Sequence, residues 1–272
     1  MKRQPTSRRF VLDQWGVLHD GSAPYPGAIA ALRALKSAGT RLAVLSNSGK
    51  RAAPNAARIT SMGFDEGLFG LVMTSGEALW QDFAAGRVTA QRLFAIDRAP
   101  GDAADWARGL DIALADTLDT ADAVLLMGLP DDAAPDAFQC VLDFALARKL
   151  PLLCTNPDRA SPRADGVIVA SPGALAHAHA ARGGEVWFYG KPHSPVFRAV
   201  EAALGVAPAR LLLVGDSLEH DIAGANAAGW ASAFVRGGLH AAEFDGRRPV
   251  LETLARIALP GAVPTFTLQH LG

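Results

Sequence analysis

The sequence is poor in cysteine and carries almost no excess charge, and both shortages narrow the kinds of protein it can encode. Its two cysteines, Cys140 and Cys154, lack the paired spacing of a zinc site or a redox motif. We expect both to be buried free thiols, because unpaired cysteine packs as a small apolar side chain. The formal net charge is -1 and the charged residues are dispersed, so the composition indicates neither a nucleic-acid partner nor an acidic membrane surface.

Long apolar runs are also missing. No stretch approaches the roughly 20 apolar residues that a membrane-spanning helix needs. Residues 1–9 are polar and basic, but no apolar segment of the signal-peptide type follows them. These absences predict a cytoplasmic protein without a membrane partner. A length of 272 residues is large for one domain and sufficient for two.

The chain does have an alternation of short apolar runs and segments of helical periodicity, which is typical of parallel α/β sheets. Near the amino terminus, this pattern predicts strands at 9–12, 41–45 and 71–73 and helices at 27–38 and 50–62. It favours a doubly wound, Rossmann-like parallel sheet through about residue 76.

The middle of the chain, residues 77–187, is predicted to form a small α/β domain of its own. Its strands are expected at 92–96, 123–127, 150–154 and 167–169, and its helices at 103–109, 135–149 and 172–182. The earlier pattern resumes afterwards, so the predicted domains are a core of residues 1–76 and 188–272 and an inserted cap of residues 77–187. A domain inserted in this way is expected to cover the sheet edge that it interrupts, as a lid over a cleft.

Polar side chains follow the strands of the predicted core. Asp13 and Asp216 each come after a short apolar run, and Ser46 and Asn47 follow the second strand. Ligands bind beyond the carboxyl ends of the strands in open α/β sheets, so these groups are expected at one edge. Two carboxylates at one edge can hold a hard cation.

Two further groups extend this set. Lys191 lies in Tyr-Gly-Lys-Pro, and Asp221 ends the segment Gly-Asp-Ser-Leu-Glu-His-Asp. A cation, a lysine, a hydroxyl and a carboxylate nucleophile are what phosphoryl transfer requires, because charge on the equatorial oxygens must be neutralised during an in-line attack. Taken singly, each residue also has an ordinary structural explanation: Asp13 or Ser46 could cap a helix, and Lys191 could be a solvated surface charge.

Four segments in order resemble the haloacid dehalogenase-like (HAD) superfamily. They are VLDQWGVLHDG, LAVLSNSG, YGKPHSPVF and LLLVGDSLEHDIAGANAAGW, and CTNPD at 154–158 resembles a segment of the cap. The resemblance covers nearly the whole chain and is to subfamily IIA, the branch with a large α/β cap that includes sugar-phosphate, nitrophenyl-phosphate and pyridoxal-phosphate phosphatases. It implies a Rossmann-like HAD core with an inserted α/β cap domain.

The resemblance also implies roles for individual residues. Asp13 would attack phosphorus and form an aspartyl-phosphate that water then hydrolyses. Mg²⁺ would be held by Asp13, the backbone carbonyl of Trp15 and Asp216, while Asp221 would orient a metal-bound water or Lys191. The implied catalytic residues are Asp13, Ser46, Lys191 and Asp221. Those implied to bind phosphate or substrate are Ser46, Asn47, Lys191, Asn156 and Asp158.

One position departs from the family pattern. Its phosphatases carry an aspartate two residues after the nucleophile, which protonates the leaving alkoxide, but this chain has Trp15 there. Such assistance is typically worth about 10²- to 10⁴-fold in rate, and indole cannot supply it. Three explanations remain open: His19 or Asp20 substitutes as the acid and base, the substrate has a good leaving group such as an acyl or aryl phosphate, or catalysis is lost and the site only binds a phosphorylated ligand.

Haloacid dehalogenases carry an aromatic residue at the position of Trp15, and they form a further alternative. Those enzymes are metal-independent, whereas Asp216 and Asp221 form an acidic pair suited to Mg²⁺. The leading hypothesis is therefore a Mg²⁺-dependent phosphomonoester hydrolase for a small phosphorylated metabolite, without an organic cofactor. A non-catalytic ligand-binding protein is the first alternative and a dehalogenase the second. Arg159 and Arg163 are candidates for a second anionic group of the substrate, and a homodimer through the cap is left open.

Overall fold

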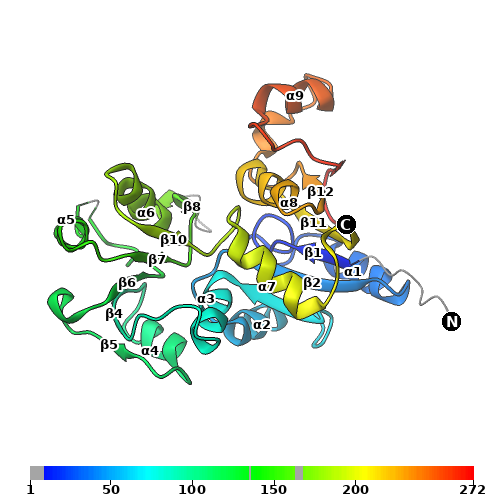
Figure 1. The fold of residues 1–272 in the computed structure, drawn as a ribbon. Helices are drawn as coiled ribbons and strands as arrows, with labels where there is room; N and C mark the ends of the chain where they lie inside the picture. The colour runs from blue at the N-terminus through cyan, green and yellow to red at the C-terminus, as the bar shows by residue number, and fades with distance from the viewer. Residues whose placement is uncertain (1–8, 135, 163–167) are drawn as a thin grey trace. The chain divides into compact units, whose positions relative to one another are not determined.

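The computed structural model describes residues 9–134, 136–162 and 168–272, and the chain divides into two compact units (Figure 1). Unit 1 comprises Met1–Ser46, Ala56–Met73 and Phe197–Gly272. Unit 2 comprises Asn47–Asn55 and Thr74–Val196. The predicted cap, residues 77–187, falls within unit 2, which extends a few residues beyond it at both ends and also takes in the segment after the second strand.

Unit 1 contains a six-stranded sheet with the order β13-β12-β11-β1-β2-β3. Its strands are β1 Arg9–Leu12, β2 Arg41–Ser46, β3 Leu71–Thr74, β11 Leu211–Gly215, β12 Ala231–Val235 and β13 Phe266–Leu268. β1 pairs in parallel with β2 on one side and β11 on the other, and β12 and β13 continue the parallel pairing. The central strand β1 thus has neighbours from distant parts of the chain, which confirms the predicted doubly wound sheet.

The helices along this part of the chain are α1 Ala28–Ser37, α2 Ala52–Ser61, α7 Ser194–Leu204, α8 Ala223–Ala227 and α9 Val250–Ile257. Helix α1 ends where predicted, because Gly39 adopts the left-handed conformation (φ 84°) that terminates many helices. Apolar side chains from the strands and helices form one buried cluster that includes Leu12, Leu32, Val44 and Phe64. Full burial of such a side chain contributes about 1.5–3 kcal/mol, so this cluster holds the strand ends in place.

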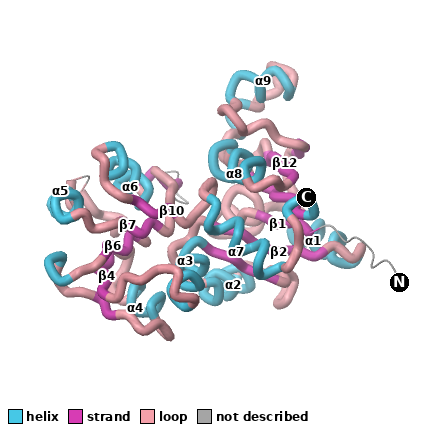
Figure 2. Tube along the Cα trace, viewed as in Figure 1, coloured by secondary structure: helices cyan, strands magenta, loops and turns pink. Residues whose placement is uncertain are grey.

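Unit 2 contains a five-stranded parallel sheet with the order β10-β7-β6-β4-β5. Figure 2 labels four of its strands, β10, β7, β6 and β4. Its strands are β4 Arg92–Ile96, β5 Ala113–Leu114, β6 Ala123–Leu126, β7 Leu152–Cys154 and β10 Val186–Phe188. A separate antiparallel pair is formed by β8 Ala160–Pro162 and β9 Ile168–Ala170. The helices are α3 Ser75–Ala84, α4 Asp102–Ala107, α5 Gln139–Arg148 and α6 Pro172–Ala181. Every residue of β6 is buried, as expected for the centre of a parallel sheet.

Helix α3 is an element that the sequence analysis does not predict. Its start carries a recognisable signal, since the Thr74 hydroxyl accepts a hydrogen bond from the Glu77 amide at 2.9 Å. The Glu77 carboxylate accepts hydrogen bonds from the Arg51 side chain and from the Ala52 amide. A threonine followed three residues later by a glutamate is the capping pattern that would have revealed this helix. The short strands β5, β8 and β10 are also absent from the predicted set.

The cysteine prediction is confirmed in one part and wrong in another. Both cysteines are free, and Cys154 is buried in β7, where burial raises the pKa of its thiol to about 12. Cys140 is exposed on α5, because the amino-terminal end of that helix presents it away from the buried Leu142 and Ala145. Within the described ranges, no helix combines the length and the apolar character that crossing a bilayer demands.

Candidate active site

The two motif aspartates are brought to one edge of the unit 1 sheet by strand pairing. β1 and β11 are in register, with Leu12 opposite Val214, and the Asp13 amide donates to the Val214 carbonyl at 2.9 Å. Asp13 therefore leaves β1 beside the point where the chain leaves β11 towards Asp216. The sequence separates these two acids by about 200 residues, and only the parallel pairing makes them neighbours.

A third carboxylate joins them. Side-chain oxygens of Asp13, Asp216 and Asp221 all lie within 4.8 Å of one another. Asp216 and Asp221 are buried, with 3% and 0% exposure. Ionised carboxylates this close to one another repel, and a bound cation relieves that repulsion. Carboxylate oxygens are the donors that a hard divalent ion such as Mg²⁺ prefers, so these residues fit a metal of that class.

Two glycines make room for the carboxylate of Asp216. A Cβ at Gly16, where φ is 80°, would lie 1.8 Å from Asp216 Oδ2, and a Cβ at Gly238 would lie 2.3 Å from the same atom. The Leu239 amide donates to this oxygen at 2.7 Å. The backbone that follows Trp15 thus packs directly on Asp216, next to the carbonyl that was predicted to bind the metal. Sequence reasoning did not single out Gly16, although a glycine three residues after Asp13 was a readable sign.

Asp221 is held by the turn that follows β11. Its Oδ2 accepts a hydrogen bond from the Ser217 amide at 3.0 Å, and a Cβ at Gly215 would lie 2.1 Å from Asp221 Cγ. This backbone contact and the close packing of Gly215 help to fix the Asp221 carboxylate. The predicted supporting role of Asp221 behind the metal ligands stays a prediction.

Trp15 and His19 lie in a tight turn after Asp13. The Gly16 amide donates to the His19 carbonyl at 3.1 Å, and the Leu18 amide donates to the Gln14 carbonyl at 2.8 Å. His19 is 1% exposed; its Nδ1 accepts from the Gly21 amide at 3.1 Å, and its Nε2 is buried without a hydrogen-bond partner among the described residues. Burial, with the charge of Arg58 as the next cause, lowers the pKa of His19 to about 4. His19 is therefore neutral at pH 7.

The Asp20 side chain accepts hydrogen bonds within the same turn. Its Oδ1 accepts hydrogen bonds at 2.8 Å from the Ser22 amide, the Ser22 hydroxyl and the Ala23 amide. These donors, with Ala23 first, lower the pKa of Asp20 to about 2. An ionised Asp20 and a neutral His19 are both poor proton donors near pH 7. The role of His19 or Asp20 as a substitute acid and base therefore stays a hypothesis, and their protonation states at neutral pH argue against it.

In unit 2, the Asn47 side chain connects three segments. Its Oδ1 accepts from the Lys191 amide at 2.7 Å, and its Nδ2 donates to Asp158 Oδ1 at 2.7 Å and to the Lys191 carbonyl at 3.1 Å. Lys191 is 2% exposed. A Cβ at Gly190 would lie 2.3 Å from Pro157 Cδ, so only glycine permits this approach. These contacts favour a positioning role for Asn47 and Asp158, which hold the backbone of Lys191 in place.

The remaining predicted residues lie at strand ends and in the cap loop. Ser46 is the last residue of β2, in unit 1. Asn156 accepts a hydrogen bond from the Asp158 amide at 3.0 Å and lines a cavity of about 140 Å³ together with Ser48, Arg98 and Ser171. Arg159 is exposed, and Arg163 lies outside the described residues.

The predicted site residues therefore form two groups. The structure brings Asp13, Asp216 and Asp221 together in unit 1, and it brings Asn47, Asp158 and Lys191 together in unit 2. Each group is held by buried hydrogen bonds or close packing. The joint action of Asp13 and Lys191 on one phosphoryl group joins residues of different units and stays a prediction.

Sequence comparison shows what the chain is related to. A family model described as haloacid dehalogenase-like hydrolase matches residues 10–100, and a second, HAD-hydrolase-like, matches residues 188–257. Human chronophin is 30% identical over 232 residues, which cover 78% of this chain and 75% of chronophin. A glycerol-3-phosphate phosphatase of Gallus gallus is 28% identical over 259 residues, covering 86% and 81% of the two chains. A dihydroxyacetone phosphatase of Corynebacterium glutamicum is 30% identical over 87 residues, about 32% of each chain.

Solved structures share the fold. A hydrolase of the haloacid dehalogenase-like family from Brucella suis superposes with a TM-score of 0.81 at 28% identity, over 98% of this chain and 96% of the other. A glycerol phosphate phosphatase from Mycobacterium tuberculosis in complex with magnesium superposes with a TM-score of 0.75 at 24% identity, over 98% of this chain and 75% of the other. The chain belongs to the haloacid dehalogenase-like hydrolase family, in the branch with a large α/β cap.

Proposed function

We propose that the protein is a Mg²⁺-dependent phosphomonoester hydrolase that acts on a small phosphorylated metabolite through an aspartyl-phosphate at Asp13. The observation that carries the proposal is the convergence of Asp13, Asp216 and Asp221 within 4.8 Å beyond the carboxyl ends of β1 and β11. The relatives named for glycerol-3-phosphate and dihydroxyacetone phosphatase activity support phosphate-ester chemistry for this family member. Asp13 is the only partly exposed member of the cluster, as a nucleophile must be to reach its substrate.

The residues present can divide the reaction between them. The Gln14 amide donates to Asp13 Oδ1 at 2.8 Å and helps to orient the carboxylate that would attack phosphorus. The bond from phosphorus to the ester oxygen breaks, and the alkoxide leaves. Water then cleaves the acyl phosphate and restores Asp13. Bound Mg²⁺, held by Asp13, Asp216 and the Trp15 carbonyl, would neutralise charge on the phosphoryl oxygens.

In this proposal Lys191 and Ser46 bind the remaining phosphoryl oxygens. Lys191 is nearly fully buried, and its backbone is fixed on both sides by Asn47, so its ammonium group is carried on a rigid segment. Rigid placement matters because a positioned charge stabilises the transition state without reorganisation.

Trp15 restricts the class of substrate. With no carboxylic acid two residues after Asp13, the leaving oxygen receives no proton from that position, and neither His19 nor Asp20 is in the protonation state of an acid at neutral pH. We infer a preference for esters with a good leaving group, such as aryl or acyl phosphates. The same observations favour a non-catalytic phosphate-binding protein as the second candidate. The buried acidic cluster argues against a metal-independent dehalogenase.

The test is a phosphate-release screen over alkyl, aryl and acyl phosphates with Mg²⁺, repeated with a chelator, beside an Asp13→Asn control. We expect release from aryl and acyl phosphates that needs the metal and disappears in the control. Binding of phosphorylated ligands without any release would support the second candidate. Release that is unaffected by the chelator or by Asp13→Asn would overturn the proposal. Dimerisation through the cap is also a proposal, which sedimentation of the full chain measures directly.

A further inference from the structure

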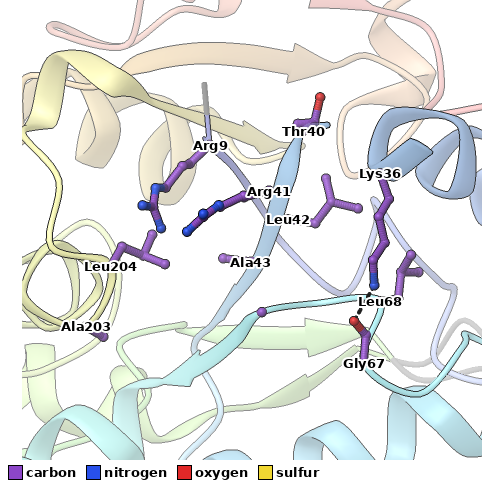
Figure 3. A pocket seen from close by; sticks show the side chains of 11 residues that line it. Arg9, Lys36, Thr40, Arg41, Leu42, Ala43, Gly67, Leu68, Ala203 and Leu204 are labelled. Carbon is purple, nitrogen blue, oxygen red and sulfur yellow. Dashed lines mark hydrogen bonds between the residues drawn. The ribbon is translucent and has the colours of Figure 1, made fainter. Parts of the chain in front are cut away.

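A basic cavity lies at the amino edge of the unit 1 sheet, at the opposite ends of the strands from Asp13 and Ser46. It has a volume of about 420 Å³ and is lined by the first residues of β1 and β2, the end of α1, the loop before β3 and the end of α7. This volume falls within the range of roughly 300–1,000 Å³ that is usual for small-molecule sites. Figure 3 shows the cavity, with cationic side chains entering it from two sides.

Strand register places two arginines side by side in this cavity. Arg9 and Arg41 are the first residues of β1 and β2 and are direct partners in the parallel pairing. Register partners point to the same face of a sheet, with the strands only about 4.8 Å apart. Figure 3 shows both guanidinium groups directed towards each other and towards Leu204. Like charges held opposite each other destabilise a sheet unless something compensates them.

No described carboxylate compensates this pair. Neither arginine forms an ion pair with a described residue, and Arg9 Nε is buried without a hydrogen-bond partner among those residues. Burial and the charges of Arg41 and Arg210 lower the pKa of the Arg9 guanidinium, and no acid counters this effect. Arginine stays protonated at neutral pH despite such a shift. Among the residues that the structure describes, nothing offsets the positive charge of this pair, and Arg9 Nε is a buried donor without an acceptor.

The rest of the surroundings adds positive charge. Lys36, at the end of α1, donates from Nζ to the Gly67 carbonyl at 2.5 Å and lines the same cavity.

We propose that this cavity binds a small anion with at least two negative charges, such as a phosphate group or a phosphate-bearing metabolite. Two guanidinium groups offer paired N–H donors in a geometry that matches phosphate oxygens, and Arg9 Nε supplies a donor that is already desolvated. The site is separate from the proposed catalytic centre, because Arg9 and Asp13 lie at opposite ends of β1, about 13 Å apart at 3.3 Å per residue. The inference does not depend on the proposed phosphatase activity.

The test is a calorimetric titration of the full chain with inorganic phosphate, without Mg²⁺ and at constant ionic strength set by chloride. Wild type is compared with Arg41→Gln, Arg9→Gln, Lys191→Met and Arg247→Gln. Arg247 has an 87% exposed side chain elsewhere on unit 1, so its variant loses the same charge as a matched control. We expect each of the first two variants to weaken phosphate binding at the cavity at least tenfold and Arg247→Gln to retain it. Lys191→Met should affect only phosphate that binds at the catalytic centre.

Three results would overturn the proposal. The first is phosphate binding that survives in both Arg41→Gln and Arg9→Gln. The second is binding that Lys191→Met removes while the two arginine variants keep it, since that places phosphate at the catalytic centre. The third is an equal loss in Arg247→Gln, which would reflect net charge only. Arg41 is exposed, so circular dichroism is expected to show a folded Arg41→Gln even where Arg9→Gln does not fold.

Discussion

The two edges of the unit 1 sheet collect opposite charges. At the carboxyl edge, three carboxylates lie within 4.8 Å of one another. At the amino edge, Arg9 and Arg41 face each other across a strand pair without a described acid between them. Both clusters use β1, so a single strand has a cationic side chain at its first residue, Arg9, and an anionic one, Asp13, just beyond its last. This difference predicts a metal cation at the carboxyl edge and a bound anion at the amino edge.

The largest expected effect is a difference in phosphate release between a variant at the carboxyl edge and one at the amino edge. Asp13→Asn should reduce phosphate release at least about 10³-fold, because losing a nucleophile that acts within a catalytic unit typically removes more than that. Arg41→Gln should leave turnover without added anions within about twofold, because it lies at the far ends of the strands. Steady-state rates with an aryl phosphate measure both. An equal loss in the two variants would show that the edges do not act independently.

A second prediction restores the missing acid at the carboxyl edge. Trp15→Asp should raise turnover of alkyl phosphates by roughly 10²-fold or more, since general acid–base assistance supplies that order of rate. Trp15→Asn is the matched control, because asparagine has nearly the same size as aspartate but carries no titratable proton. The ratio of alkyl to aryl phosphate rates is the measurement. A comparable gain in both variants would mean that removing the indole, and not adding an acid, caused the change.

A third prediction concerns the glycine on which Asp216 packs. Gly16 and Gly39 have nearly the same backbone conformation, with φ of 80° and 84°, but only a Cβ at Gly16 meets Asp216, while a Cβ at Gly39 meets nothing within 4 Å. Replacing either by alanine should lower the free energy of unfolding by about 1–2 kcal/mol through backbone strain. Gly16→Ala should add a further loss and weaken Mg²⁺ binding about tenfold, because Asp216 must move.

Urea unfolding and Mg²⁺ titration of the two alanine variants measure these effects. Gly39→Ala serves as the control, since it retains the whole acidic cluster. Unchanged Mg²⁺ affinity in a folded Gly16→Ala protein would show that Asp216 is not placed by this contact, and it would weaken the assignment of the metal to this edge.

The smallest expected effect is a pH dependence from His19, in the turn beside the acidic cluster. Its pKa is about 4 in the folded chain, against an ordinary value of 6.5, so the unfolded chain binds a proton more readily. The stability linked to His19 is therefore fully present above pH 6.5 and is lost as the pH falls towards 4. Melting temperatures at pH 7.5, 6 and 4.5 should fall more steeply for wild type than for His19→Gln. Parallel curves would exclude this linkage.

Much of the fold could be predicted from local patterns. The core strands follow short apolar runs, and Gly39 and Gly63 end helices near the predicted positions. Helix α3 and the short strands β5, β8 and β10 were not found, since strands of two or three residues hardly differ in pattern from loops. The prediction that Cys140 is buried is also wrong, because composition does not fix which face of a helix is covered.

The site shows the same division. The acidic residues could be identified from their place after apolar runs, but the role of Asn47 as the anchor of Lys191 and Asp158 appears only when its three hydrogen bonds are known. The cations of the amino edge were not noticed at all. Arg9 and Arg41 begin two ordinary strands, and nothing in either segment indicates that they meet.

The sequence by itself determined the alternation of strands and helices, the motif residues at the strand ends and the replacement of the family's acid by Trp15, because each is encoded within a few neighbouring positions. Tertiary structure alone decided how closely the oxygens of Asp13, Asp216 and Asp221 approach one another, that Gly16 admits the Asp216 carboxylate, and that Arg9 stands beside Arg41. These outcomes depend on strand order and register, which bring distant residues to within a few ångströms and fix which charges must share one edge.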